Sequence, residues 1–166
     1  MADVLIRPAA LRDLPRLLAI YNHYVATSAI TFDIDPCTLE DRRDWYTEHT
    51  IGAGHRLLVA EAGSEIVGYA GTGAFRAKRA YETTVETTVY LAPEATGRGV
   101  GTRLYAALFA ALAGEDVHRA VAGVTLPNPV SLALHRRFGF REVGVFRENG
   151  RKLGRYWDVM WLERAL

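Results

Sequence analysis

The segment from Thr83 to Leu104 most constrains what this chain can fold into, because it joins a strand to a glycine-rich turn and then to a helix. Residues 83–91 are rich in Thr, Val and Tyr, which favour a pleated strand. Gly97, Gly99 and Gly101 follow, and an Ala- and Leu-rich helix is predicted from about Gly101. Glycines let a ligand approach the backbone, and the first N–H groups of a helix are unpaired donors. The arrangement predicts an enzyme that binds a pyrophosphate.

A single carboxylate lies in the middle of the predicted strand. Strand alternation places Thr84, Glu86, Thr88 and Tyr90 on one face of the sheet. Because Glu is a poor strand residue and is rarely buried without a partner, one interpretation makes Glu86 a general base. The other interpretation is a Glu on a solvated sheet face, and periodicity alone does not separate the two.

The glycine turn fits neither of two common phosphate-binding motifs. A Walker loop ends in Gly-Lys followed by Ser or Thr, whereas Gly101-Thr102-Arg103 lacks the lysine. The dinucleotide fingerprint would need glycine or alanine at position 102 if Gly97 and Gly99 were its first two glycines. Thr102 stands there instead, so both motifs are excluded.

The turn Thr96-Gly97-Arg98-Gly99-Val100-Gly101 resembles the coenzyme A loop of the GNAT family of N-acetyltransferases, whose pattern is Gln or Arg, two residues, Gly, one residue, then Gly or Ala. Thr96 replaces the usual Gln or Arg, which weakens one side-chain contact and leaves the backbone cradle intact. Residues 128–140 resemble the family's helix that ends in Gly-Phe and borders the pantetheine arm. Further segments between Tyr21 and Val159 are similar to the phosphinothricin and methionine sulfoximine acetyltransferases of this family.

Periodicity and the resemblance agree on the fold. We expect one N-acetyltransferase domain over residues 1–166, of the α/β (α+β) class, with a mixed, mostly antiparallel central sheet of about seven strands and helices on both faces. Thr38, with Asp41 three residues on, can cap a helix that runs to about Ile51. The predicted strands are residues 4–7, 57–62, 65–75, 83–91, 120–124, 142–148 and 156–162, and the other predicted helices begin near residues 11, 101 and 130.

The resemblance implies that acetyl-CoA is the co-substrate. The family splays its sheet at the Glu86 strand, where backbone N–H groups would hold the thioester carbonyl. Asn128 has a short amide suited to the pantetheine arm, although it could equally cap the following helix. The expected coenzyme contacts are Val89, Tyr90, Leu91, Gly97, Arg98, Gly99, Val100, Gly101, Thr102 and Asn128.

Two residues are candidates for proton transfer. Glu86 matches the family's catalytic carboxylate and would accept the ammonium proton directly or through water, aided by burial that raises its pKa. No covalent intermediate is required. His135 stands where many relatives have a tyrosine that protonates the leaving thiolate, and an imidazole with an ordinary pKa of about 6.5 can donate a proton. Alternatively, His135 only packs against or hydrogen-bonds the coenzyme.

Substrate choice is expected to depend on the segment before the Glu86 strand. Three cationic side chains in this segment, followed by Tyr81, suit a carboxylate or phosphinate on an amino acid. They are Arg76, Lys78 and Arg79. The resemblance implies that Phe32 packs on the methyl end of such a substrate. The alternative is a solvated loop that only keeps the protein soluble.

We therefore expect an N-acetyltransferase that acts on the α-amino group of a small amino acid analogue such as phosphinothricin, methionine sulfoximine or methionine sulfone. A protein or peptide N-terminal acetyltransferase of the same fold is one alternative, and it would need an open groove. A non-catalytic acyl-CoA-binding domain is the other.

Composition bounds the partners. The net charge of +1 gives no electrostatic reason to expect nucleic acid or a membrane surface as a partner. A single cysteine, Cys37, excludes an intrachain disulfide and fits a reducing cytoplasm, and neither a signal peptide nor a membrane span is expected. Histidines other than His135 are too scattered for a metal site. The resemblance implies a homodimer, for which the aromatic segment 156–162 is either an interface or a core strand.

Overall fold

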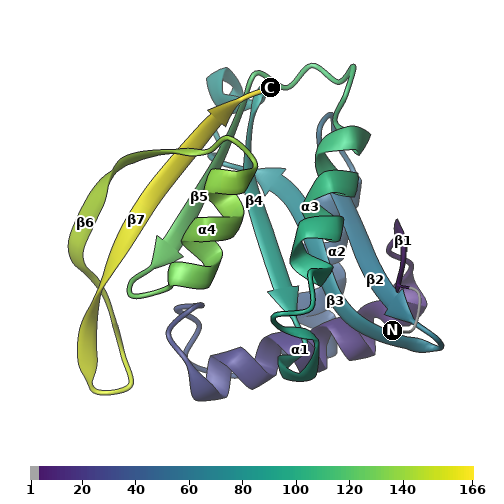
Figure 1. Cartoon of the computed structure of the whole chain (residues 1–166), viewed down its shortest axis with the longest axis horizontal. Coiled ribbons are helices and arrows are strands. Elements are labelled where there is room, and N and C mark those ends of the chain that lie inside the picture. Colours follow the sequence, from purple (N-terminus) through teal and green to yellow (C-terminus); the bar gives the residue numbers. More distant parts are fainter. Residues whose placement is uncertain (1–3) are drawn as a thin grey trace.

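The computed structural model describes residues 4–166, which fold around one seven-stranded sheet (Figure 1). The strands lie in the order β1-β2-β3-β4-β5-β7-β6, and only the β4–β5 pair is parallel. The mixed, mostly antiparallel sheet expected from the sequence is therefore confirmed. The elements are β1 (Val4–Pro8), α1 (Leu14–Thr27), α2 (Leu39–Thr50), β2 (Arg56–Ala62), β3 (Glu65–Ala74), β4 (Thr84–Leu91), α3 (Val100–Ala111), β5 (Arg119–Thr125), α4 (Pro129–Arg137), β6 (Arg141–Lys152) and β7 (Arg155–Ala165).

Helices cover both faces of the sheet. On one face, aromatic side chains of α1 and α2 pack against Tyr69 of β3 and Tyr90 of β4, whose rings stack 5.6 Å apart. On the other face, the fully buried Tyr105 of α3 meets Thr87 of β4 and His135 of α4. Opposite faces of one strand thus contact different helices, as alternation requires.

The N-terminus of α2 forms as the sequence predicts. Thr38 accepts a hydrogen bond from the N–H of Asp41 at 3.2 Å, and the Asp41 carboxylate accepts the Thr38 N–H at 2.7 Å. This capping box satisfies two donors that the helix leaves unpaired. The helix begins at Leu39 and ends at Thr50, within one residue of the expected end.

Strands β6 and β7 are longer than predicted and form a ribbon at the sheet edge (Figure 1). The pairing continues through the polar stretch around Gly150 to a two-residue turn at Leu153 and Gly154, whose φ values are 51° and 78°. Positive φ at both positions is the geometry of a tight hairpin. Because this part of β6 is polar, the sequence did not predict that the strand extends so far. In β7 the side chain of Leu162 is fully buried and Tyr156 is exposed, so the core-strand interpretation of residues 156–162 holds for part of that segment.

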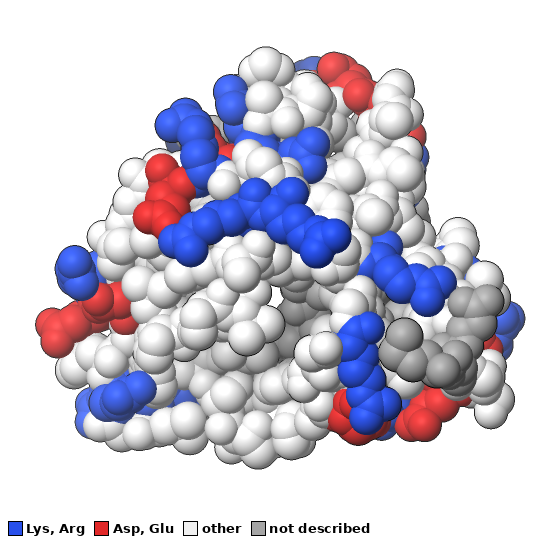
Figure 2. All heavy atoms as spheres, viewed as in Figure 1, with Lys and Arg blue, Asp and Glu red and all other residues white. Residues whose placement is uncertain are grey.

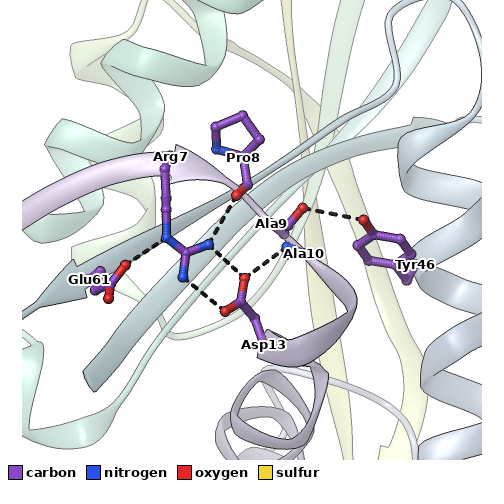
Figure 3. A network of polar contacts seen from close by, with 7 residues as sticks. All are labelled: Arg7, Pro8, Ala9, Ala10, Asp13, Tyr46 and Glu61. Atoms are coloured by element: carbon purple, nitrogen blue, oxygen red, sulfur yellow. Dashed lines mark hydrogen bonds and ion pairs between the residues drawn. The ribbon is translucent and has the colours of Figure 1, made fainter. Parts of the chain in front are cut away.

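An ion-pair network fixes the entry into α1 (Figure 3). Arg7 of β1 donates to Glu61 of β2 at 2.6 Å and to both carboxylate oxygens of Asp13 at 2.7 and 2.9 Å. Asp13 is buried and also accepts the Ala10 N–H at 2.8 Å. Because α1 begins at the next residue, this network sets the position of the aromatic side chains that α1 contributes to the site.

Replacing Asp13 by Ala should lower the free energy of unfolding by about 3 kcal/mol, since it leaves the half-buried Arg7 with only Glu61 and the Pro8 carbonyl as partners and the Ala10 N–H with none. Hydrogen bonds from Arg7 hold the pKa of Asp13 below its usual range. The contribution of Asp13 is therefore complete above the ordinary aspartate pKa and is lost as the pH falls through the lowered value. Urea unfolding of both proteins at several pH values measures this difference, and a pH-independent gap would contradict the assignment. Asp35→Ala, on an exposed loop, is the control.

Candidate active site

The sheet opens between β4 and β5. These strands pair only where Thr84–Glu86 meets Arg119–Val121, and beyond that point their edges separate. The gap is a cavity of about 200 Å³ lined by both strands, Gly101 and Tyr105 of α3 and the first turns of α4. The splayed strand that the resemblance implied is thus present, and it leaves an unpaired strand edge inside the molecule.

Backbone groups of β4 point into this opening. Ala92 donates its N–H to Val67 at 2.9 Å, and β3 and β4 pair without interruption up to this point. Because alternate residues of an antiparallel strand bond to opposite sides, Thr88 and Tyr90 face β3 whereas the N–H groups of Val89 and Leu91 face the opening. An extended ligand can therefore add to this edge as a further strand. All three residues predicted here line the opening; the N–H of Tyr90 faces β3, and Tyr90 also lines the cleft on the opposite face.

The glycine turn lies at one end of the opening. Gly97 and Gly99 have φ values of 70° and 78°, which side chains disfavour, and Gly99 is the N-cap of α3. The first intrahelical bond runs from the Arg103 N–H to Gly99 at 3.1 Å. The N–H groups of residues 100–102 therefore have no helical acceptor and suit the oxygens of a pyrophosphate. Arg98 is exposed. Figure 2 shows a hollow in this face with Lys and Arg side chains above it and beside it.

Helix α4 forms the other wall. Asn128 is its N-cap and accepts the Ser131 N–H at 3.1 Å, so the capping interpretation is confirmed, and the same residue lines the opening. His135 is buried, with Nδ1 2.7 Å from the Ser131 carbonyl and Nε2 3.0 Å from the Tyr105 hydroxyl. Since a carbonyl only accepts, Nδ1 carries the proton and Nε2 accepts from Tyr105. Burial lowers the pKa of His135, which keeps the imidazole neutral. Sequence reasoning missed Tyr105.

Glu86 lies on the face of β4 opposite to Tyr105 and His135. It is half-buried in a cleft of about 810 Å³ between the sheet and α2. Burial raises the pKa of its carboxyl above the usual 4.5, and the nearby cation of Arg76 partly opposes the shift. The cleft and the opening share five lining residues, which are Ile30, Thr87, Thr88, Tyr90 and Gly123. Two sites on opposite faces of the sheet therefore meet where β4 and β5 separate.

The comparisons with known proteins agree with this geometry. The sequence profile described as the acetyltransferase (GNAT) family matches residues 17–140. The chain belongs to the GNAT acetyltransferase family. It is thus an acetyl-CoA-dependent N-acetyltransferase, as the resemblance implied.

The chain is similar to the phosphinothricin N-acetyltransferase of Streptomyces coelicolor, with 56% identity over 99% of this chain and 98% of the relative. It is 35% identical to the L-methionine sulfoximine/L-methionine sulfone acetyltransferase of Pseudomonas aeruginosa, over 97% of this chain and 94% of that protein. The crystal structure of a phosphinothricin acetyltransferase from Sinorhizobium meliloti in complex with acetyl-CoA matches with a TM-score of 0.94 and 31% identity, covering 100% of this chain and 89% of that one.

The predicted substrate residues of this GNAT chain do not gather at one place. Arg76 lines the Glu86 cleft. Lys78 is exposed and is not among the lining residues, and the Arg79 side chain is 94% exposed and lies 4.0 Å from Glu82. Tyr81 contacts the ring of Phe75, which itself lines the cleft, edge to face at 5.7 Å. Of these four residues, only Arg76 lines the same cleft as Glu86.

Phe32 is also placed away from the cleft. A Cβ added to Gly150 of β6 would collide with the Phe32 ring, so this ring packs closely on the β6–β7 ribbon. Ile30, two residues earlier, lines the cleft instead. Within residues 4–166, no group of three or more His, Cys, Asp and Glu side chains is placed to hold a metal ion. None of the helices in that part of the chain is long and apolar enough to cross a membrane.

Proposed function

We propose that this enzyme transfers the acetyl group of acetyl-CoA to the α-amino group of a small amino acid analogue of the phosphinothricin, methionine sulfoximine or methionine sulfone type. The observation that carries the proposal is the junction at Thr87 and Thr88, where the coenzyme opening meets the Glu86 cleft. An amine in the cleft and a thioester in the opening can meet at this junction. The names and full-length coverage of the relatives support the substrate class.

The reaction proceeds by direct attack. Glu86 takes a proton from the ammonium group, directly or through water, and its raised pKa makes it a better base at neutral pH. The free amine attacks the thioester carbonyl while the N–H groups of Val89 and Leu91 hold the developing oxyanion. A C–N bond forms, the C–S bond breaks, and the thiolate takes up a proton.

The proton for the thiolate comes from the Tyr105–His135 pair. Tyr105 donates to His135 and both line the opening, so the hydroxyl is the donor that a thiolate reaches. His135, held neutral by burial and by its bond to Ser131, accepts from that hydroxyl through Nε2 and orients it, and the proton that Tyr105 gives to the thiolate is replaced from solvent. The role first assigned to His135 alone is thus shared with the side chain of Tyr105.

Arg76 is the cation that receives the α-carboxylate. Arg76→Ala should lower kcat/KM for an amino acid by about tenfold or more, because one charge-assisted contact is lost. Lys78→Ala, two residues away on an exposed loop, is the matched control and should change kcat/KM little. Steady-state thiol release measures the effect with phosphinothricin and with the methyl ester of its α-carboxylate. Equal losses for both variants, or for both substrates, would remove Arg76 from this role.

A homodimer is proposed for the β6–β7 ribbon. Phe146, Tyr156 and Val143 are 54%, 58% and 59% exposed, and Phe146 and Val143 line an apolar cavity of about 390 Å³. A second copy would cover this surface. Phe146→Glu should then convert a dimer into a monomer in light scattering at micromolar concentration. A wild-type protein that is already monomeric under those conditions would contradict the proposal.

We place the action of the enzyme in the cytoplasm, where acetyl-CoA is available and the thiol of Cys37 stays reduced.

Competing substrates test the proposed function. Thiol release from acetyl-CoA should be fast with phosphinothricin, methionine sulfoximine and methionine sulfone, and slow with peptides that carry a free N-terminus. A peptide-acetylating enzyme of the same fold is the alternative that this comparison addresses. Peptides that react faster than every free amino acid would favour that alternative over the proposal.

A further inference from the structure

A second cavity of about 190 Å³ lies beside the Glu86 cleft, between α1, α2 and the ends of β3 and β4. It shares Trp45, Thr88 and Tyr90 with the cleft. Thr88 follows Glu86 by two positions on the same face of β4, so the two Cα atoms are about 7 Å apart. The side chain of an amino acid whose amine lies at Glu86 can therefore extend along the strand into this second cavity.

A buried cation faces this cavity. Arg42 of α2 is 4% exposed, and its guanidinium lies 3.8 Å from the centre of the Trp45 ring and 4.5 Å from that of Tyr21. One terminal nitrogen donates to the Tyr69 hydroxyl, whereas Nε is buried without a hydrogen-bond partner. Among the ion pairs of residues 4–166, none involves Arg42. Since burying an unpaired cation is unfavourable, a ligand oxygen is the missing partner.

The acidic residues around the cavity are already bonded to protein donors. Asp41 accepts the N–H and the hydroxyl of Thr38, each at 2.7 Å. Asp33 accepts the Tyr21 hydroxyl at 2.7 Å, and the buried ammonium of Lys152 offsets its charge. Arg42 therefore remains the donor with unused hydrogen-bonding capacity. The aromatic rings on either side hold its planar group in one orientation.

We propose that Arg42 is a specificity-determining residue that donates to an oxygen on the distal end of the amino acid substrate, such as a phosphinate, carboxylate or sulfone oxygen. The inference rests on the proposed function, in which Glu86 receives the amine and Arg76 the α-carboxylate. Arg76 then binds the α-carboxylate and Arg42 binds the distal oxygen of the same substrate. An amino acid with a distal methyl group would leave the Arg42 donor unpaired and is disfavoured for that reason.

Paired substrates test this role. Arg42→Gln should lower kcat/KM for phosphinothricin by about tenfold or more, mainly through KM, and should change that for norleucine by about threefold or less. Arg43→Gln, at the exposed neighbouring position of α2, is the matched control and should leave both values unchanged. Arg42→Lys keeps the charge but lacks the planar guanidinium group. Its kcat/KM for phosphinothricin should lie between the values of the parent and of Arg42→Gln. Equal losses for phosphinothricin and norleucine would make Arg42 a structural residue and overturn the inference.

A second measurement needs no variant, because it compares protection of a cysteine with acetylation of the same substrate. Cys37, the single cysteine, lines the same cavity. Burial raises the pKa of its thiol, so alkylation by iodoacetamide is followed at mildly alkaline pH. With desulfo-coenzyme A present, which has no thiol of its own, phosphinothricin should slow this alkylation by about fivefold or more near saturation, whereas norleucine should not. Acetylation of phosphinothricin without any protection of Cys37 would overturn the Arg42 assignment and leave the function standing. Absence of both would overturn the proposed function as well.

Discussion

Glu86→Gln should lower kcat/KM by about 10²-fold or more, because the amide keeps the shape of the side chain and removes its basicity. Acetyl-CoA affinity should stay within about twofold of the parent value, since Glu86 lies in the cleft and does not line the coenzyme opening. Thiol-release kinetics and calorimetry measure the two quantities. Glu48→Gln, which changes another glutamate of the same cleft, is the matched control and should retain activity.

The pH dependence of the wild-type enzyme tests the same role. Burial raises the pKa of Glu86 above its usual 4.5, so the carboxyl becomes protonated at a pH where an ordinary glutamate is still ionised. The acidic limb of kcat/KM should therefore lie above that value. Because the Arg76 cation opposes the shift, Arg76→Ala should move the limb to still higher pH. A Glu86→Gln enzyme with near-parental activity and an unchanged pH profile would exclude Glu86 as the base.

Gly101→Val should raise the Kd for acetyl-CoA by about tenfold or more. A Cβ at this position would make ordinary contacts with Leu134 at 3.5 Å and Leu91 at 3.7 Å, so Gly101→Ala fits and should have a smaller effect. The two further methyl groups of Val would enter the opening between these side chains, where overpacking is unfavourable by about 1–3 kcal/mol. Calorimetry with acetyl-CoA measures the change.

A valine elsewhere separates this effect from a loss of folding. Gly144 of β6 has open space around its Cβ, so Gly144→Val should bind acetyl-CoA like the parent. Thermal unfolding of both variants should show that each is folded. If Gly101→Val is folded and binds acetyl-CoA with parental affinity, the coenzyme lies elsewhere than in this opening.

The sequence was sufficient where function depends on local backbone chemistry. The Thr-, Val- and Tyr-rich strand, the glycine turn and the Ala- and Leu-rich helix are each predicted from local sequence, and the structure gives positive φ at Gly97 and Gly99. The capping box at Thr38 is equally local. The separation of β4 from β5 was implied only by the family resemblance, since no residue in either strand marks where pairing stops.

Tertiary packing decided the features that the sequence did not predict. Arg42 stands in a very polar helix, LEDRRDWYTEHT, where a solvated cation is the ordinary expectation, yet aromatic side chains from α1 and β3 bury it. Phe32 was expected at the substrate, but the missing side chain of Gly150 leaves room for its ring on a ribbon far along the chain. Arg76 and Lys78 look equivalent in sequence, and only the course of the loop brings one of them to the cleft.

In the proposed reaction, one cleft brings an amino acid's α-amine to a thioester held between β4 and β5. The most direct test incubates the purified enzyme with acetyl-CoA and phosphinothricin, quantifies the released thiol, and identifies the product by mass spectrometry and NMR. We expect one thiol per product molecule and an acetyl group on the α-nitrogen. Tight acetyl-CoA binding without acetylation of phosphinothricin, methionine sulfoximine or methionine sulfone would contradict this account.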